Sequence, residues 1–207
     1  MHSLMKRVHA GIYAERLRRL VGIMVPLLRA GDRILDVGCG NGTLVRALLD
    51  DAACPPGVTG TGVERSPRGG EPITVVPYGG GRLPFDDRGF DFVIVADVLH
   101  HEPNEEGLLA ECARVARRNV FLKDHARDGL LAQKRISLID WAANAPYGVP
   151  CLYRYHSRSE WRSLFQRMGL TLEREYHPLK LYPRGWEFAF GGTLQYAALL
   201  RPGEPAP

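Results

Sequence analysis

Apolar residues recur along this 207-residue chain with two different spacings, which alternate from segment to segment. Steps of three and four residues across 4–28 predict an N-terminal helix, which Pro26 is expected to kink or end. Short apolar runs rich in β-branched and aromatic residues predict strands, and helical spacing returns between them. The predicted strands are 34–37, 58–64, 73–77, 90–96, 119–124, 170–176 and 193–200, and the later helices are 43–51, 105–117, 130–143 and 157–168. This alternation predicts a doubly wound α/β sheet, whose ligands bind at the carboxyl ends of the strands.

The first predicted strand runs into a turn with three glycines and one preceding acid: Asp36, Gly38, Gly40 and Gly42. A strand, a glycine turn and a helix start are expected to gather unpaired backbone N–H groups, and glycine lets a ligand approach the main chain. The dinucleotide fingerprint has the spacing G-x-G-x-x-G, whereas this turn has G-x-G-x-G. A carboxylate at position 36 repels a pyrophosphate but suits an ammonium or a sulfonium. The turn therefore predicts a nucleoside site for a positively charged ligand.

This motif resembles the first motif of class I S-adenosylmethionine (SAM) methyltransferases. The segment Phe90–Ala96 with Leu99-His-His101 is similar to the ubiquinone/menaquinone-type small-molecule members, methyltransferase type 11. The resemblance implies a Rossmann-like, doubly wound seven-stranded sheet with an antiparallel final strand and helices on both faces. It also implies SAM as cofactor and S-adenosylhomocysteine as product. Glu64, 22 residues after Gly42, is expected to accept from the ribose hydroxyls.

Related methyltransferases often carry an aspartate that reaches the adenine amino group, and Gly79 stands at that position here. Adenine recognition is therefore left to backbone groups or to Tyr78. The residues expected to contact the cofactor are Asp36, Gly38, Cys39, Gly40, Asn41, Gly42, Glu64, Arg65, Tyr78, Gly79, Gly80, Ala96 and Asp97.

Composition predicts one globular domain over 1–207, with 1–29 as N-terminal helix and 129–156 as an insertion over the substrate. The net charge is +4 and the basic residues are scattered, which indicates solvated helix faces and no nucleic-acid partner. Four cysteines without C-x-x-C spacing favour a reduced, cytoplasmic protein. No apolar run is long enough to predict a membrane span. We expect a monomer or a homodimer.

Methyl transfer from a sulfonium depends mainly on positioning, which contributes about 7–11 kcal/mol against about 3–5 kcal/mol for a general base. The candidate bases are His101, His125 and His156, with Asp124 as an orienting partner of His125. The expected substrate contacts are Tyr13, His100, Tyr153 and Tyr155, with the segment 153–156 forming an aromatic lid. The large aromatic residues expected in the core are Trp141, Tyr147, Trp161 and Trp186. No histidine or cysteine pair has a zinc-ligand spacing, so no metal is expected.

The sequence thus predicts methyl transfer from SAM to an oxygen, nitrogen or carbon atom of a small molecule. Two alternatives remain open at this stage. One is an RNA or protein methyltransferase, although 96–99 lack the Asn-Pro-Pro-Tyr-like signature of amino methylation. The other is a protein that binds SAM without transferring its methyl group. A nicotinamide oxidoreductase is disfavoured by the glycine spacing and by Asp36.

Overall fold

The computed structural model describes residues 2–144 and 151–203, and its elements follow the predicted alternation. The strands are β1 (Arg33–Val37), β2 (Thr59–Glu64), β3 (Thr74–Pro77), β4 (Phe90–Ala96), β5 (Ala116–His125), β6 (Thr171–Tyr176) and β7 (Gln195–Arg201). The α-helices are α1 (His2–Met24), α2 (Thr43–Asp50), α3 (Glu105–Val115), α4 (Ala132–Asn144), α5 (Arg158–Arg167) and α6 (Arg184–Phe190). Short 3-10 helices are η1 (Val25–Leu27), η2 (Leu99–His101) and η4 (Gly192–Leu194). The N-terminal helix ends where Pro26 predicts.

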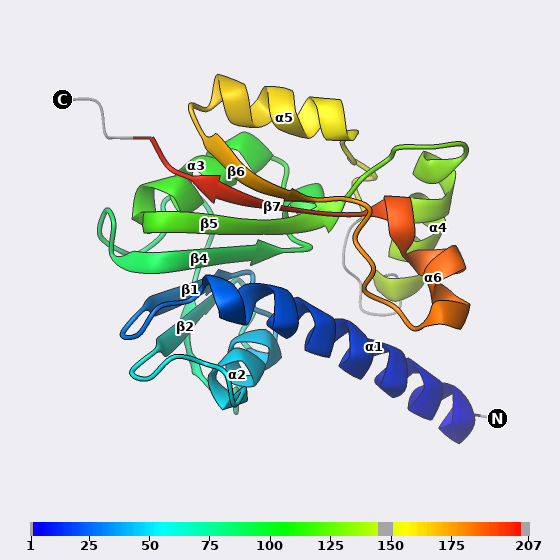
Figure 1. Ribbon diagram of the computed structural model, residues 1–207, viewed down its shortest axis with the longest axis horizontal. Coiled ribbons are helices and arrows are strands. Elements are labelled where there is room, and N and C mark those ends of the chain that lie inside the picture. The colour runs from blue at the N-terminus through cyan, green and yellow to red at the C-terminus, as the bar shows by residue number, and fades with distance from the viewer. Residues whose placement is uncertain (1, 145–150, 204–207) are drawn as a thin grey trace.

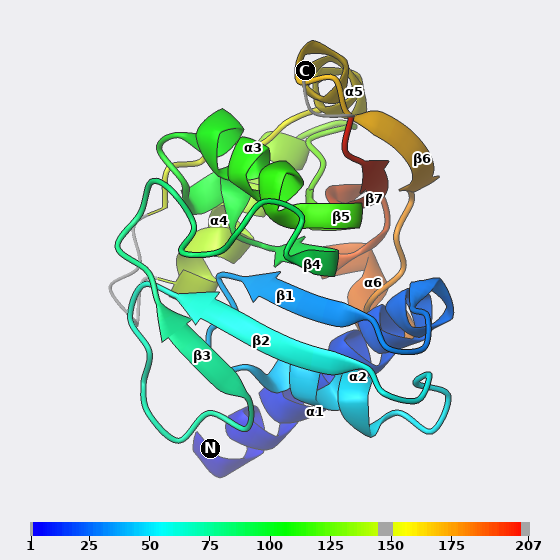
Figure 2. The same cartoon turned by 90° about the vertical axis from the view of Figure 1, so that its left-hand side faces the viewer.

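Seven strands form one sheet in the order β3-β2-β1-β4-β5-β7-β6 (Figure 1 and, with β3 labelled, Figure 2). Strand β1 pairs in parallel with β2 and β4, and β7 lies antiparallel between β5 and β6. The predicted Rossmann-like sheet with an antiparallel final strand is therefore confirmed. The strand order reverses between β1 and β4, and in such sheets the crevice at the reversal holds the ligand.

Helices cover both faces of the sheet, with α1 and α2 on one side and α3 and α5 on the other (Figure 2). Successive residues of a strand pack against the helices on opposite faces of the sheet. Ile34 packs with the cluster beneath α1 and α2, and its neighbour Leu35 packs with the cluster beneath α3 and α5. Burial on both faces explains why the central strands are continuous apolar runs rather than alternating ones.

Helices α4 and α6 lie together beyond the carboxyl ends of β4 and β5 (Figure 1). Helix α6 was not predicted, because its seven residues include Gly185 and show no clear periodicity. Part of the predicted insertion, 145–150, lies outside the described residues. Between β2 and β3 the described chain forms no helix, as the glycines and prolines of 66–72 predict.

The expectation that the basic segments form solvated helix faces is wrong in two places. Arg117 and Arg118 belong to β5, so the helix ends at Val115, earlier than predicted. Arg118 bonds the largely buried Asp32, and Arg16 on α1 bonds a carboxylate at the end of β4. Among the helices the structure describes, none combines the length and apolar character that a membrane span requires.

Candidate active site

The turn after β1 adopts the left-handed backbone at all three glycines. A Cβ at Gly38 would lie 2.6 Å from Val98, and a Cβ at Gly42 would lie 2.7 Å from Ile73. A Cβ at Gly40 would meet nothing within 4 Å. Two of the glycines are therefore required by packing against protein, and Gly40 borders open space that a ligand can enter.

Several backbone N–H groups of this turn are paired within the protein, so the prediction of unpaired groups is wrong for Gly38, Cys39 and Gly40. The N–H groups of Gly38 and Cys39 both donate to Val63 O, at 2.8 Å and 3.2 Å. Gly40 N donates to Glu64 Oε2 at 2.9 Å. These donors hold the turn against β2 instead of forming a phosphate cradle, which agrees with a nucleoside ligand rather than a pyrophosphate.

Asp36 supplies a buried negative charge beneath the turn. It is 3% exposed, and no cationic side chain among the described residues pairs with it. Burial and the nearby Glu64 carboxylate raise the pKa of Asp36 to about 7. A cation beside this carboxylate would relieve that penalty, so the residues fit a ligand with an ammonium or sulfonium group. The Glu64 carboxylate accepts the backbone N–H groups of Gly40 and Arg65, at 2.9 Å and 2.8 Å, and its contact with a ribose stays a prediction.

The expected adenine side lies after β2 and β3. Tyr78 is buried and donates through its hydroxyl to Gly81 O at 2.7 Å, so it shapes the loop 78–81. Arg65 pairs with Glu102 at 2.6 Å. Tyr78, Gly81 and Glu102 share a cavity of about 210 Å³. Tyr78 thus fixes this loop from inside, with its hydroxyl already engaged.

The remaining predicted cofactor residues have clear places. Cys39 is buried, and the Asn41 side chain accepts from the Thr43 hydroxyl at 2.6 Å at the start of α2. Ala96 ends β4, and Asp97 follows it in the left-handed region with φ of 56°. For a non-glycine residue this conformation is strained, and such strain clusters at functional sites.

Two residues around Asp97 were missed by the sequence analysis. Its carboxylate bonds Lys123 of β5 and Arg16 of α1. Burial alone would raise the pKa of Asp97, but these two cations hold it well below its usual range. A lysine inside the apolar run of β5 is the signal that could have identified one partner, since buried lysines are almost always paired.

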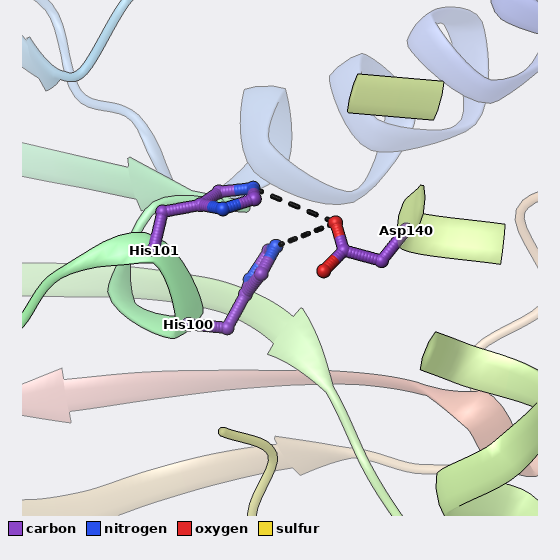
Figure 3. A group of neighbouring side chains, drawn as sticks. All are labelled: His100, His101 and Asp140. Carbon is purple, nitrogen blue, oxygen red and sulfur yellow. Dashed lines mark ion pairs between the residues drawn. The ribbon is translucent and has the colours of Figure 1, made fainter. Parts of the chain in front are cut away.

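The main feature at the carboxyl ends of β4 and β5 is a histidine cluster, formed by His100, His101 and His125. His100 and His101 come from η2, and both direct Nε2 toward Asp140 Oδ1 of α4, each at 3.7 Å (Figure 3). The ring centroids of His100 and His125 are 5.1 Å apart. The sequence analysis named these histidines but did not include Asp140.

His100 is tied to Asp124, which corrects the prediction that Asp124 orients the His125 ring. His100 Nδ1 and Asp124 Oδ1 are 2.7 Å apart, whereas the same oxygen accepts only the backbone N–H of His125. Burial opposes the charged imidazole, but the Asp124 carboxylate outweighs it and raises the pKa of His100 to about 10.

His125 has the opposite environment. Its Nδ1 lies 3.2 Å from Leu194 O, and its Nε2 lies 4.0 Å from Asp97 Oδ1. Burial and the Lys123 ammonium lower the pKa of His125 to about 4. His125 is therefore neutral at pH 7, next to a charged His100.

The residues of the aromatic segment 153–156, expected to form a lid, have three different environments. Tyr155 is buried and donates to Asp140 Oδ2 at 2.6 Å, and its ring packs against His100 and His125. Tyr153 is 42% exposed. His156 lies 2.9 Å from Glu105 and packs on a core tryptophan, so it is separate from the histidine cluster.

The other predicted aromatic positions are mixed. Tyr13 is exposed on α1. Trp161 is a core residue as predicted, whereas Trp141 and Trp186 are exposed on α4 and α6, so the core prediction is wrong for these two. Tyr147 lies outside the described residues.

Comparison with known proteins agrees with this geometry. A family model described as a methyltransferase domain matches residues 8–175. The chain is 37% identical over 112 residues to 27-O-demethylrifamycin SV methyltransferase of Amycolatopsis mediterranei. It is 39% identical over 92 residues to tRNA U34 carboxymethyltransferase of Methylococcus capsulatus. These matches cover 48% and 41% of this chain, and only 39% and 28% of the relatives' lengths.

A solved complex of the Haloferax volcanii Trm112 methyltransferase activator contains a methyltransferase with the same fold. The TM-score is 0.66 at 18% identity, covering 99% of this chain and 94% of the other. At that identity the likeness shows the fold alone. The family model spans most of the chain, and the acid-led glycine turn fits the cofactor. The chain therefore belongs to the class I SAM-dependent methyltransferases, of the type 11-like kind, and uses SAM as its cofactor.

Proposed function

We propose that this enzyme methylates a hydroxyl group of a small molecule. The observation that carries the proposal is the histidine cluster beside the cofactor turn, at the carboxyl ends of β4 and β5. A hydroxyl must lose its proton during methylation, and an imidazole is the side chain best suited to assist at neutral pH. The 27-O-demethylrifamycin SV methyltransferase named above supports an oxygen acceptor.

In the proposed mechanism, SAM supplies a methyl group already activated on a positive sulfur. Asp36 stabilises the cationic end of the cofactor, and Glu64 binds its ribose. Asp97 is held by its two cations at the end of β4, and His101 and His125 assist removal of the acceptor proton. His101 is the more accessible of the two, with its side chain 21% exposed. His156 is a weaker candidate, because its imidazole contacts Glu105 outside the cluster.

A small acceptor is favoured over RNA by how the basic side chains are used. RNA binding needs a stripe of basic residues available to phosphates. Many arginines of this chain instead bond carboxylates of the same molecule: Arg46, Arg82, Arg114, Arg117, Arg127, Arg158, Arg162, Arg167 and Arg201.

All four cysteines lie within the described residues and no disulfide joins them, which supports a reducing compartment such as the cytoplasm.

The test is a transfer assay with methyl-labelled SAM, a panel of hydroxylated small molecules and, in parallel, bulk tRNA. We expect label on small-molecule oxygen. His101→Gln should lower kcat by about 10²-fold or more with SAM affinity unchanged, because a general base contributes about 10²–10⁴-fold. His177→Gln, outside the cluster, is the matched control. Label found only in tRNA would overturn the small-molecule acceptor, and SAM binding without transfer to any acceptor would overturn transfer itself.

A further inference from the structure

We propose that His100, His101 and Asp140 bind a divalent metal ion of the zinc class beside the acceptor. The three residues come from two elements distant in sequence, η2 and α4, and the fold brings them together at the end of the sheet (Figure 3). Two imidazoles and one carboxylate are donors that suit Zn²⁺ and related first-row ions better than Mg²⁺ or Ca²⁺.

The distances fit an ion better than they fit hydrogen bonds. The Nε2 atoms of His100 and His101 each lie 3.7 Å from Asp140 Oδ1, and the three ligand atoms lie within 4.8 Å of one another. A nitrogen and an oxygen at that distance exceed the hydrogen-bond range of about 2.7–3.2 Å. Ligand atoms about 2.1 Å from a tetrahedral zinc ion stand about 3.4 Å apart. The two nitrogen-to-oxygen distances would shorten by a few tenths of an ångström, and the two imidazole nitrogens, which lie within 4.8 Å of each other, would move closer by up to about 1.4 Å.

Two of the three ligands, His100 and Asp140, have partners of the kind that orient ligands in metal sites. His100 holds Asp124 through Nδ1 at 2.7 Å, which turns Nε2 toward Asp140. The Tyr155 hydroxyl donates to Asp140 Oδ2 at 2.6 Å, which turns Oδ1 toward the two imidazoles. A carboxylate behind a histidine and a donor behind a carboxylate fix ligand orientation in known metal centres. The His100, Asp124 and Asp140 side chains are almost fully buried, so their orientation is set by packing.

The charges around the cluster allow an ion to replace the proton on His100. Asp97, Asp124 and Asp140 carry three negative charges, and Lys123, Arg16 and the protonated His100 balance them. Asp124 Oδ2 is buried and has no hydrogen-bond partner among the described residues. A dication that displaces the His100 proton, together with an ionised acceptor hydroxyl, keeps the sum of these charges at zero.

Three protein ligands leave a coordination position open for the acceptor oxygen. This role rests on the proposed hydroxyl methylation, whereas the metal site itself does not. The ion would lower the pKa of the hydroxyl, and its proton would pass to solvent. The oxygen then forms a bond to the methyl carbon as the bond from carbon to sulfur breaks, leaving a neutral thioether. His101 would act as a ligand rather than as a base, with neutral His125 beside it.

The test is a calorimetric titration of Zn²⁺ into the untagged full-length chain at about pH 8, after chelator treatment and dialysis. We expect one site of micromolar affinity or tighter. Asp140→Asn and His101→Gln should each weaken it at least tenfold, and His177→Gln should leave it unchanged. Circular dichroism of each variant shows whether it folds. If Asp140→Asn does not fold, His101→Gln still tests the site, because the His101 side chain is partly exposed.

Absence of zinc binding in the wild type, or its retention in both cluster variants, overturns the metal site. Unchanged methyl transfer by the zinc-free enzyme overturns the activating role but leaves the site. Failure of methyl transfer to every acceptor, with zinc binding as expected, counts against the proposed function only.

Discussion

Replacing Asp36 by asparagine should make the ligand-free protein more stable while weakening its hold on SAM. The carboxyl is buried without a cationic partner, and its pKa rises from 3.8 to about 7. That difference corresponds to about 4 kcal/mol in the free energy of unfolding. Asparagine has nearly the same shape but no charge, so it escapes this penalty.

The direction of the change in stability with pH follows from the pH range in which each state of the protein loses the Asp36 proton. Between about pH 4 and pH 7 the unfolded chain loses the Asp36 proton while the folded protein keeps it, so ionisation of this group lowers stability as pH rises. The stability gained by Asp36→Asn should therefore be near zero at pH 4 and approach about 4 kcal/mol at pH 8. Urea unfolding at several pH values measures it. Asp86→Asn, at an exposed position, is the matched control.

SAM should show the opposite response, because its positive charge needs the ionised carboxylate. Wild-type affinity should rise with pH up to about 7, by as much as tenfold per pH unit. At pH 8 Asp36→Asn should lose about 2 kcal/mol of binding, or roughly 30-fold in Kd, the value of a charge-assisted contact. A variant with unchanged stability at pH 8 and unchanged SAM affinity would refute the assignment of Asp36 as the uncompensated anion of the cofactor site.

Three further substitutions test the rest of the site. Gly38→Ala should cost about 1–3 kcal/mol in urea unfolding, because its Cβ would collide with a valine side chain; Gly40→Ala, which keeps the left-handed backbone but faces open space, should cost less. Glu64→Gln should raise the Kd for SAM about tenfold by calorimetry, because the charged acceptor of the ribose hydroxyls is lost; an unchanged Kd counts against that role. Arg16→Met should destabilise the protein by about 1–3 kcal/mol, since it breaks a partly buried ion pair with Asp97, whereas the exposed Arg18→Met should change stability by under 0.5 kcal/mol. Equal losses for the two arginines would contradict a structural role for the Arg16 ion pair.

The residues of the expected cofactor site could be predicted because they lie close together in the sequence. Asp36, the three glycines and Glu64 lie within one strand, turn, helix and strand unit, so their spacing fixes their places in space. The same locality made the capping box of α5 predictable, since Ser157 and Glu160 bond each other's backbone across three residues. The spacing does not predict which acceptors bind the backbone N–H groups of the turn. Those acceptors lie on β2, and they come close only because β1 and β2 pair.

The residues on the expected acceptor side could be predicted only in part, because tertiary packing brings them together from distant parts of the sequence. His100 and His101 were identified from their place after β4, but Asp140 lies on a helix about forty residues later. Nothing in the local pattern says that α4 crosses the carboxyl ends of β4 and β5. Likewise Arg16 sits in a run of basic residues whose members differ only in which side of α1 they occupy. Arg16 is partly buried and Arg18 is exposed, and this difference depends on how the helix packs.

The clearest limit on prediction from residue type is the pair of His100 and His125, whose rings lie 5.1 Å apart. Both follow predicted strands, and both are buried. Yet the pKa of His100 is raised to about 10 and that of His125 is lowered to about 4, because one faces Asp124 and the other lies near the Lys123 ammonium. Two imidazoles in opposite states give the enzyme a strong electrostatic contrast within one site. Any account of how the acceptor loses its proton must therefore begin from the charges that each ring faces.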